Sequence, residues 1–424
     1  MNVAPTMTPA TEGFLRRYEG LRQRLPGDHT ARDAAAARFR DSGGLPTVRD
    51  EPWRFTNLRS LAALHFDEAL STIDGDATPA ATSDLPDAPR VVLVDGRLRP
   101  DLCILPDGVT LIAFADDPRF GTLADPVRER LVALNTMLAE DGARLSVADG
   151  VDAGVVHLIS LATETPSRTT AFHPRHSVTV GRGARLTLFE TSRGEGAYLH
   201  NPVTEITVAE NAHMVHARLQ DEADTAFHLA TIYVEIAADA TYDAFTLNLG
   251  ARLARAEFHA HLIGPRASVH LNGAQVVDGE RLADFTSVVA HDAPNCASRQ
   301  TVKTVLDDRA RGVFQGRIDV ARIAQKTDGY QMNQALLLSP EAEIDSKPEL
   351  RINADDVKCS HGATVGELDA TQLFYLRSRG VPVAEARAIL VRAFLTEALD
   401  AVTDEAIRAT LDEAVAGWWE RKAA

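Results

Sequence analysis

Cysteine is scarce in this chain of 424 residues, which has only Cys103, Cys296 and Cys359. Three widely spaced cysteines cannot build a disulfide framework, and such scarcity is typical of proteins that stay in a reducing compartment. Long apolar runs are missing as well, since no window approaches the roughly 18 uncharged residues that span a bilayer. The N-terminus also lacks the basic-then-apolar pattern of a secretory signal. We therefore expect a cytoplasmic protein that does not bind a membrane.

Basic residues are fewer than acidic residues. The chain has 44 Lys and Arg residues against 60 Asp and Glu residues, which gives a formal net charge of -16. A protein with this balance repels phosphate backbones and anionic lipid surfaces, so we do not expect nucleic acid as a partner. Hydrophobic residues make up 45% of the chain and charged residues 25%, which is ordinary for a folded globular protein.

The common catalytic motifs are absent too. The sequence has no Gly-x-x-x-x-Gly-Lys-Ser/Thr phosphate loop and no Gly-x-Gly-x-x-Gly turn, so it offers no recognisable cradle for a nucleotide. It also lacks the Gly-x-Ser-x-Gly elbow of hydrolases, the His-Glu-x-x-His helix and any Cys-x-x-Cys pair. These absences argue against nucleotide hydrolysis and against the familiar hydrolase and zinc sites.

Helical patterns occupy much of the N-terminal part. Apolar residues recur at spacings of three and four between residues 8 and 41, where Phe14, Tyr18, Leu21 and Leu25 form one stripe. A second stretch with the same spacing covers residues 126–140. We expect residues 1–150 to form a mostly helical region with short strands.

Residues 151–366 have a different character. Short runs rich in β-branched residues alternate there with Gly, Asp, Asn and Pro, which indicates strands and turns. A small residue recurs in the same local setting at Ala184, Ala212, Ala240 and Ala267, at intervals of 28, 28 and 27 residues. A turn and a strand repeated at a fixed period are typical of a solenoid of stacked coils. The pattern predicts a mainly β protein with a parallel β-helix core over residues 151–366, and a β-sandwich is the alternative fold.

Helical signals return over residues 367–424. Gly380 is a helix stop signal, and Pro382 suits the beginning of the next helix. Apolar residues then form a wide face that includes Ile389, Leu390 and Phe394. We expect two or three closing helices, with part of this face available to a partner.

Histidine is concentrated in the β region, where eleven of the 14 histidines lie between residues 157 and 291. His259 and His261 are two residues apart and would share one face of a strand, as a metal site of the cupin type requires. No suitably placed Glu follows them, because the next residues are Leu262-Ile263-Gly264-Pro265-Arg266. A metal-binding β-helix or a cupin-like enzyme is therefore kept as the alternative function.

Cys359 and His361 form a sharper pair where the strand signals give way to helix. On an extended strand both side chains point the same way, and a thiolate and an imidazole can both bind iron or zinc. Two ligands do not complete a tetrahedral site or hold an iron–sulfur cluster, so a metal here would need ligands from another subunit. The alternative is a structural cysteine beside a hydrogen-bonded histidine.

The segment around this pair carries a long resemblance. Residues 355–366 (Asp-Asp-Val-Lys-Cys-Ser-His-Gly-Ala-Thr-Val-Gly) and residues 373–380 (Leu-Phe-Tyr-Leu-Arg-Ser-Arg-Gly) are similar to the C-terminal signature of the SufD branch of the SufB/SufD family. The likeness continues upstream through residues 312–316, 325–331 and 344–350. Residues 51–56 resemble the Trp-Arg-Tyr-Thr segment of the family, with Phe55 in place of Tyr. The chain is thus similar to proteins of the SUF system, which assembles iron–sulfur clusters.

The resemblance implies a right-handed parallel β-helix core between N-terminal and C-terminal helical regions. It also implies a non-catalytic scaffold subunit that joins a SufB-like scaffold and a SufC-like ATPase, or a homodimer when the chain is isolated. His361 would then be a ligand for iron or a cluster at the subunit interface, and Cys359 an auxiliary ligand or a structural thiol. The isolated chain would hold no tightly bound cofactor, and a cluster or iron would be present only transiently in the complex.

The C-terminal helices of that family dock the ATPase. The resemblance makes candidates of Leu373, Phe374, Tyr375, Leu376, Arg379 and Phe394. A pure structural adaptor, for which His361 and Cys359 would be dispensable, is a further possibility.

Overall fold

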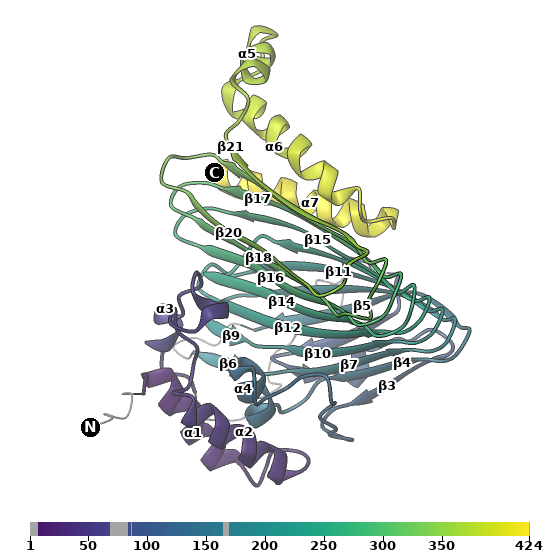
Figure 1. The fold of residues 1–424 in the computed structure, drawn as a ribbon. Helices are drawn as coiled ribbons and strands as arrows, with labels where there is room; N and C mark the ends of the chain where they lie inside the picture. The colour runs from purple at the N-terminus through teal and green to yellow at the C-terminus, as the bar shows by residue number, and fades with distance from the viewer. Residues whose placement is uncertain (1–6, 68–83, 86, 164–168, 424) are drawn as a thin grey trace.

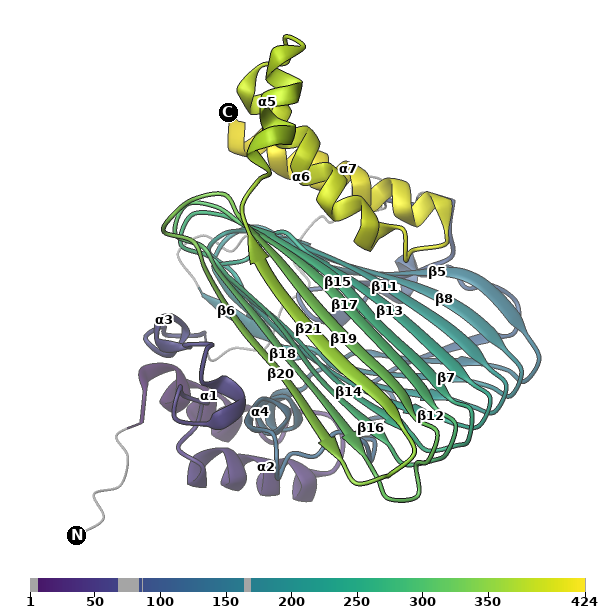
Figure 2. The same ribbon diagram turned by 45° about the horizontal axis from the view of Figure 1, so that its top comes forward.

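Two long β-sheets form the body of the protein, and helices pack on the outside of each sheet (Figures 1 and 2). The computed structural model describes residues 7–67, 84–85, 87–163 and 169–423. From β4 and β5 onward the strands of each sheet are paired in parallel, and the chain passes from one sheet to the other at every coil. This arrangement is a parallel β-solenoid, so the predicted mainly β fold with a β-helix core is confirmed.

The first sheet has ten strands. Their order is β2 (Arg97–Leu98), β1 (Arg90–Val94), β5 (Asp152–Ala162), β8 (Arg185–Gly194), β11 (His213–Glu222), β13 (Thr241–Asn248), β15 (Ser268–Val277), β17 (Ala297–Leu306), β19 (Asp328–Leu337) and β21 (Lys358–Gly366). Only β2 is antiparallel to its neighbour.

The second sheet has eleven strands. Nine follow the order β20 (Glu343–Ile352), β18 (Arg311–Val320), β16 (Leu282–His291), β14 (Leu253–Leu262), β12 (Phe227–Ile236), β10 (Val203–Val208), β7 (Arg175–Val180), β4 (Ala143–Val147) and β3 (Val109–Ala113). The two short strands β6 (Thr170–Phe172) and β9 (Tyr198–His200) pair with each other, and β9 also pairs with β12. β3 is antiparallel to β4.

The 28-residue repeat marks one corner of the solenoid. Each of the four turns has a residue with positive φ followed by a buried alanine: Gly183–Ala184, Asn211–Ala212, Asp239–Ala240 and Arg266–Ala267. The left-handed residue turns the chain into the next strand, and the small side chain after it fits where the coil is tightest. The series continues at Asn295–Cys296 and Lys326–Thr327. Cys296 is therefore a packing residue of the core, with its thiol 3.3 Å from the carbonyl oxygen of Gly264.

The N-terminal helices cover the outer face of the second sheet. They are α1 (Pro9–Leu21), α2 (His29–Asp41), α3 (Arg59–Ala62) and α4 (Arg130–Leu138), with a short 3₁₀ helix at Glu51–Trp53. Another 3₁₀ helix, Pro100–Leu102, packs instead against β1 of the first sheet. Phe14 and Phe39 share an apolar cluster with Leu199 and Leu229 of the sheet. The helical prediction for residues 8–41 is wrong at residues 22–28. After α1 ends at Leu21 the chain forms turns, and Pro26 with Gly27, whose φ is 86°, keeps it out of a helix until α2 begins at His29.

Helices α6 (Val383–Leu399) and α7 (Glu405–Ala423) cover the outer face of the first sheet. Leu395 and Leu411 are fully buried against Leu219 and Leu247. In contrast, α5 (Ala370–Ser378) has no buried residue and projects away from the body in Figure 2. The closing helices predicted for residues 367–424 are confirmed, and only α5 stands free of the sheets.

The two ends of the solenoid differ. At one end the antiparallel strands β2 and β3 follow the first parallel strands, and we call β1–β4 the capped end. At the other end β20 and β21 are the last strands of the two sheets, and we call this pair of strands the open end. Residues 1–150 supply the whole capped end in addition to helices α1–α4.

Candidate functional site

Cys359 and His361 lie on β21, the last strand of the first sheet. In the parallel register Cys359 is next to Gly329 and His361 is next to Gln331, both of which are buried and belong to the row that faces the solenoid interior. The two candidate ligands continue this inward row one coil further. No described strand follows β21, so no further coil covers this row at the end of the solenoid. His361 is therefore exposed although it belongs to the inward row.

The thiol of Cys359 is half-buried against the apolar core. Its sulfur lies over Gly329, where an added Cβ would be only 3.4 Å away. Burial raises the pKa of the Cys359 thiol, and the nearby Asp328 carboxylate acts in the same direction. Burial thus favours the neutral thiol, and a metal ion that bound Cys359 would displace its proton to solvent.

A shallow hollow lies beside Cys359. It has a volume of about 520 Å³ and is lined by Arg299, Asp328, Tyr330, Lys358, Cys359 and Ser360. Arg299 is paired with Asp328 at 2.8 Å. Apart from Cys359, these residues belong to the outward row, so the hollow lies on the outer face of the first sheet and not on the face that carries the His361 side chain.

The sequence analysis missed the polar residues directly beneath His361. Gln331 is fully buried, and neither its amide nitrogen nor its amide oxygen has a hydrogen-bond partner. Asn333 donates to Ser346 Oγ at 3.0 Å but its amide oxygen is unpaired. Unpaired polar groups inside a protein are costly, so this part of the core is suited to a polar group that arrives from the open end. The only sequence signal was the spacing that puts Gln331 in register with His361.

The open end also exposes the edges of both sheets. β20 and β21 have no buried residue, and each has a neighbour on one side only. Ile352 is 41% exposed and Val365 is 54% exposed. An edge of this kind presents unpaired backbone donors and acceptors together with apolar side chains, which is a surface that a further strand can extend.

The proposed docking residues divide into two groups. Phe374 is 72% exposed and Tyr375 is 57% exposed on α5, whereas Leu373 and Leu376 are half-buried. The Arg379 guanidinium lies 5.3 Å from the centre of the Tyr375 ring. Phe394 is different, because its ring packs on the first sheet and lies 4.5 Å from Lys303 Nζ. Five of the six candidates are thus on or next to the projecting helix, and Phe394 contacts its own solenoid.

Two further apolar residues near α5 are exposed. Val383 is 50% exposed and Ile389 is 43% exposed on α6. Sequence analysis placed Ile389 in a wide apolar face but did not single out Val383. They extend the apolar surface of α5 onto the neighbouring helix. An apolar stripe alone could not separate them from the residues of α6 that face the sheet.

The paired histidines of β14 do not act together. His259 Nε2 lies 3.1 Å from Glu257 Oε1, and these two form a group with Glu129 whose ligand atoms all lie within 4.8 Å. His261 is not a member of this group. The carboxylates near His259 come from an earlier position in the strand and from the N-terminal region, so a search downstream of His261 could not find them.

The chain matches proteins of one family in two comparisons. Residues 161–394 match the family described as SUF system FeS cluster assembly, SufBD core domain. The iron–sulfur cluster assembly protein SufD of Escherichia coli is 34% identical over 370 residues, which cover 86% of this chain and 87% of that protein. An iron–sulfur cluster assembly SufBD family protein of Synechocystis is 33% identical over 401 residues, covering 88% of this chain and 87% of the relative.

A plant relative is named Protein ABCI7, chloroplastic, of Arabidopsis thaliana. It is 30% identical over 389 residues, covering 86% of this chain and 80% of its own length. Among the residues that the structure describes, no helix is both long and apolar enough to cross a membrane. The family resemblance inferred from residues 355–366 is confirmed, and the chain belongs to the SufB/SufD family of the iron–sulfur cluster assembly system.

Proposed function

We propose that this chain is a non-catalytic scaffold subunit of a SUF complex for iron–sulfur cluster assembly. In this proposal His361 supplies a ligand to iron or to a nascent cluster at the interface with a SufB-like subunit. Helix α5 docks a SufC-like ATPase, which supplies the nucleotide hydrolysis that this sequence has no motif for. The chain itself holds and orients groups, and the cluster is the cargo of the assembly.

The position of His361 carries the proposal. It is an exposed imidazole in the inward row of the last strand, with unpaired polar groups of Gln331 beneath it. An iron–sulfur cluster is normally held by four ligands. His361 and Cys359 together provide two, so the remaining ligands come from the subunit that covers the open end.

The open end suits a partner with the same architecture. The edges of β20 and β21 can pair with strands of a second solenoid, which would bury Ile352 and Val365. A SufB-like subunit is the natural partner in the complex. A second copy of this chain would occupy the same surface in the isolated protein and give a homodimer.

The surface of α5 supports the docking of an ATPase. An amphipathic helix that packs on its own protein buries its apolar side, yet Phe374 and Tyr375 project into solvent. Exposed aromatic residues on a protruding helix are typical of anchors that fill a pocket of a partner. The ATPase would therefore receive α5 with part of α6.

Replacement of His361 by Ala tests the proposed ligand. The exposed side chain contributes little to folding, so His361→Ala is expected to co-purify with the SufB-like and SufC-like subunits at the wild-type stoichiometry. Anaerobic reconstitution with iron and sulfide is expected to give at least a tenfold lower yield of cluster. Ser360→Ala, on the same strand with its side chain on the opposite face, is the matched control and keeps the wild-type yield.

Wild-type cluster yield in the His361→Ala complex would contradict the proposed ligand and leave the chain as a structural adaptor. Cys359→Ala in the same assay separates the two roles of the thiol. A lower yield with a normal melting temperature assigns Cys359 as an auxiliary ligand. A normal yield with a lower melting temperature assigns it as a packing residue.

A further inference from the structure

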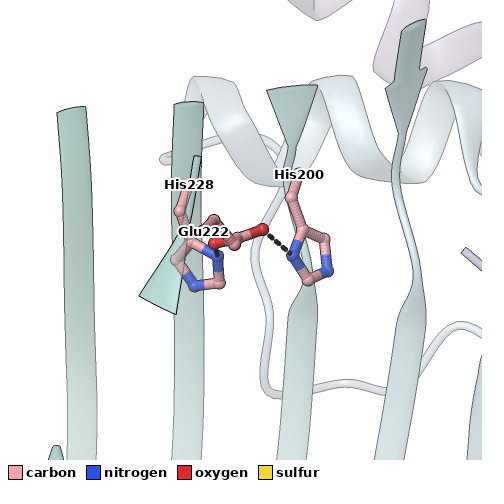
Figure 3. A group of neighbouring side chains, drawn as sticks. All are labelled: His200, Glu222 and His228. Carbon is pink, nitrogen blue, oxygen red and sulfur yellow. Dashed lines mark hydrogen bonds and ion pairs between the residues drawn. The ribbon is translucent and has the colours of Figure 1, made fainter. Parts of the chain in front are cut away.

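A second group of metal-binding side chains lies inside the solenoid. Glu222 is the last residue of β11, His228 is near the beginning of β12, and His200 is the last residue of β9. Figure 3 shows both imidazoles directed toward the Glu222 carboxylate. His200 and His228 are side by side in the parallel register, and the chain turns a corner of the solenoid between Glu222 and His228. Three strands thus bring together residues that are not close in the sequence.

The three side chains are almost completely buried and tightly grouped. Their side chains are 1–2% exposed. The Nδ1 atom of His200 lies 3.1 Å from Glu222 Oε1, and the Nδ1 atom of His228 lies 2.7 Å from Glu222 Oε2. One ligand atom from each residue lies within 4.8 Å of the others. The two rings are nearly perpendicular, with their centres 4.9 Å apart.

Hydrogen bonding accounts for only part of this arrangement. His200 Nδ1 is hydrogen-bonded to Glu222 Oε1. The close contact between His228 Nδ1 and Glu222 lacks the alignment of a hydrogen bond, and this Nδ1 atom has no other partner. Buried imidazoles normally satisfy their polar atoms. A cation that both Nδ1 atoms and the carboxylate approach together would give His228 Nδ1 a partner.

The surroundings hold the carboxylate in place. Tyr198 donates to Glu222 Oε1 at 3.1 Å, and Gln220 Nε2 donates to Glu222 Oε2 at 2.9 Å. Gly194 leaves room for the tyrosine, since an added Cβ there would lie 2.6 Å from the Tyr198 hydroxyl oxygen. Metal-binding carboxylates are commonly oriented by such outer hydrogen bonds.

We propose that His200, Glu222 and His228 bind one divalent transition-metal ion, zinc or ferrous iron, inside the solenoid. Two imidazole nitrogens and one carboxylate oxygen are a donor set that suits these ions. The three ligands leave a fourth position of a tetrahedral site for a water molecule or another neutral group. This site goes beyond the proposed scaffold function and does not depend on it.

A surface pocket gives a route to the site. Glu222 lines a pocket of about 620 Å³ at the corner of the solenoid, beside α7. The lining of this pocket has both acidic residues (Glu195, Asp221, Asp224, Asp278 and Glu280) and basic residues (Arg252, Arg281, Arg421 and Lys422). Because the Glu222 side chain is 1% exposed, an ion would reach it from this pocket when side chains at the corner move.

The internal site is remote from His361. β21 is the fifth strand beyond β11 in the first sheet, and five strand spacings correspond to about 24 Å. A subunit that covers the open end therefore does not cover the internal site. The proposal departs from the sequence-based expectation that the isolated chain holds no tightly bound cofactor.

Metal binding by the full chain tests the site. The protein is stripped with a chelator and dialysed against Co²⁺ and, separately, Zn²⁺, and bound metal is measured by mass spectrometry of the elements. The wild type is expected to bind one equivalent and to melt at a higher temperature with Zn²⁺. His228→Asn and Glu222→Gln are each expected to weaken binding more than about 100-fold, beyond the loss typical of an outer hydrogen bond.

A second His-carboxylate-His group provides the matched control. His213 and His270 contact different oxygens of Asp243 on the outer surface, and their ligand atoms do not form a group within 4.8 Å. His213→Asn is expected to keep the wild-type affinity. Glu129→Gln, in the group with Glu257 and His259, is also expected to keep it.

The Co²⁺ spectrum gives a readout that does not depend on the folding of a variant. A tetrahedral site of nitrogen and oxygen ligands gives visible d–d bands without the ultraviolet charge-transfer band of a thiolate. The proposal is overturned if the stripped wild type binds no metal, if a thiolate band places the ion at a cysteine, or if Glu129→Gln rather than His228→Asn removes binding. None of these results bears on the cluster yield of the His361→Ala complex, so the two proposals fail separately.

Discussion

The two ends of the solenoid differ in how the terminal coil is shielded from solvent. At the capped end, β1 is almost wholly buried from Val91 to Val94, and the antiparallel strands β2 and β3 follow the first parallel strands. At the open end, β20 and β21 contain no buried residue although their alternate side chains continue the inward rows of β18 and β19. Terminal coils of repeat proteins normally require a cap that shields the stack.

The difference shows which end of the solenoid is covered by the described residues of the chain itself. Residues 1–150 supply both a cap and helices for one end, whereas the described residues after β21 form helices that pack on the side of the stack or project from it. The uncovered row contains Cys359 and His361. The open end is therefore the part of the molecule where burial by a second subunit would complete the core and the candidate site together.

The largest effect should come from removing matched leucines at the two ends. Leu93 of β1 is fully buried, and Leu350 of β20 is half-buried at the edge of the same core. Leu93→Ala is expected to lower the free energy of unfolding by about 3 kcal/mol, because it leaves a cavity inside the capped end. Leu350→Ala in the isolated chain should cost about 1 kcal/mol, since water already reaches that position.

Urea unfolding of the two variants under conditions that keep the chain monomeric measures this difference. Equal losses would mean that the open end is already covered in the isolated chain. That result would contradict the proposed difference in burial between the two ends.

A smaller effect separates the two phenylalanines of the C-terminal helices. Phe394 packs on the first sheet, so Phe394→Ala should cost about 1–2 kcal/mol of stability. Phe374 is 72% exposed, so Phe374→Ala should change stability by less than about 0.5 kcal/mol. The order should reverse for binding of the SufC-like ATPase, which Phe374→Ala is expected to weaken at least tenfold.

Thermal melting measures the stability of the two variants, and titration calorimetry on the same preparations measures their binding to the ATPase. If Phe394→Ala weakened ATPase binding more than Phe374→Ala did, the docking surface would lie on α6 against the sheet, and α5 would lose its proposed role.

Much of the fold could be predicted because each coil obeys the same local rule. A left-handed residue followed by a small buried one recurs at Ala184, Ala212, Ala240 and Ala267, and steric limits at one corner allow little else. The shared face of Cys359 and His361 could be predicted for a similar reason, since it follows from the two-residue period of a strand. These features depend on neighbours in the sequence.

Features that depend on distant contacts could not be predicted. The strands β1 and β4 join the parallel sheets although most of the helices of residues 1–150 surround them in the sequence. Nothing local indicates that Phe394 faces the sheet while Ile389 of the same helix is exposed. The group of His200, Glu222 and His228 is set by the register of three strands and a corner, so the spacing of these residues matches no known motif.

A charge placed on the last strand tests the open end most directly. Val365 of β21 is 54% exposed in the inward row, and Ile112 of β3 is 40% exposed on the last strand of the capped end. Either aspartate substitution should cost less than about 1 kcal/mol of stability in the isolated chain. Sedimentation equilibrium of the isolated variants and co-purification with the SufB-like subunit measure association.

Val365→Asp is expected to be monomeric and to lose the SufB-like subunit, because partner binding would bury an unpaired charge. Ile112→Asp is expected to associate like the wild type. Wild-type association of Val365→Asp, or loss of association in Ile112→Asp alone, would contradict the assignment of the open end as the subunit interface.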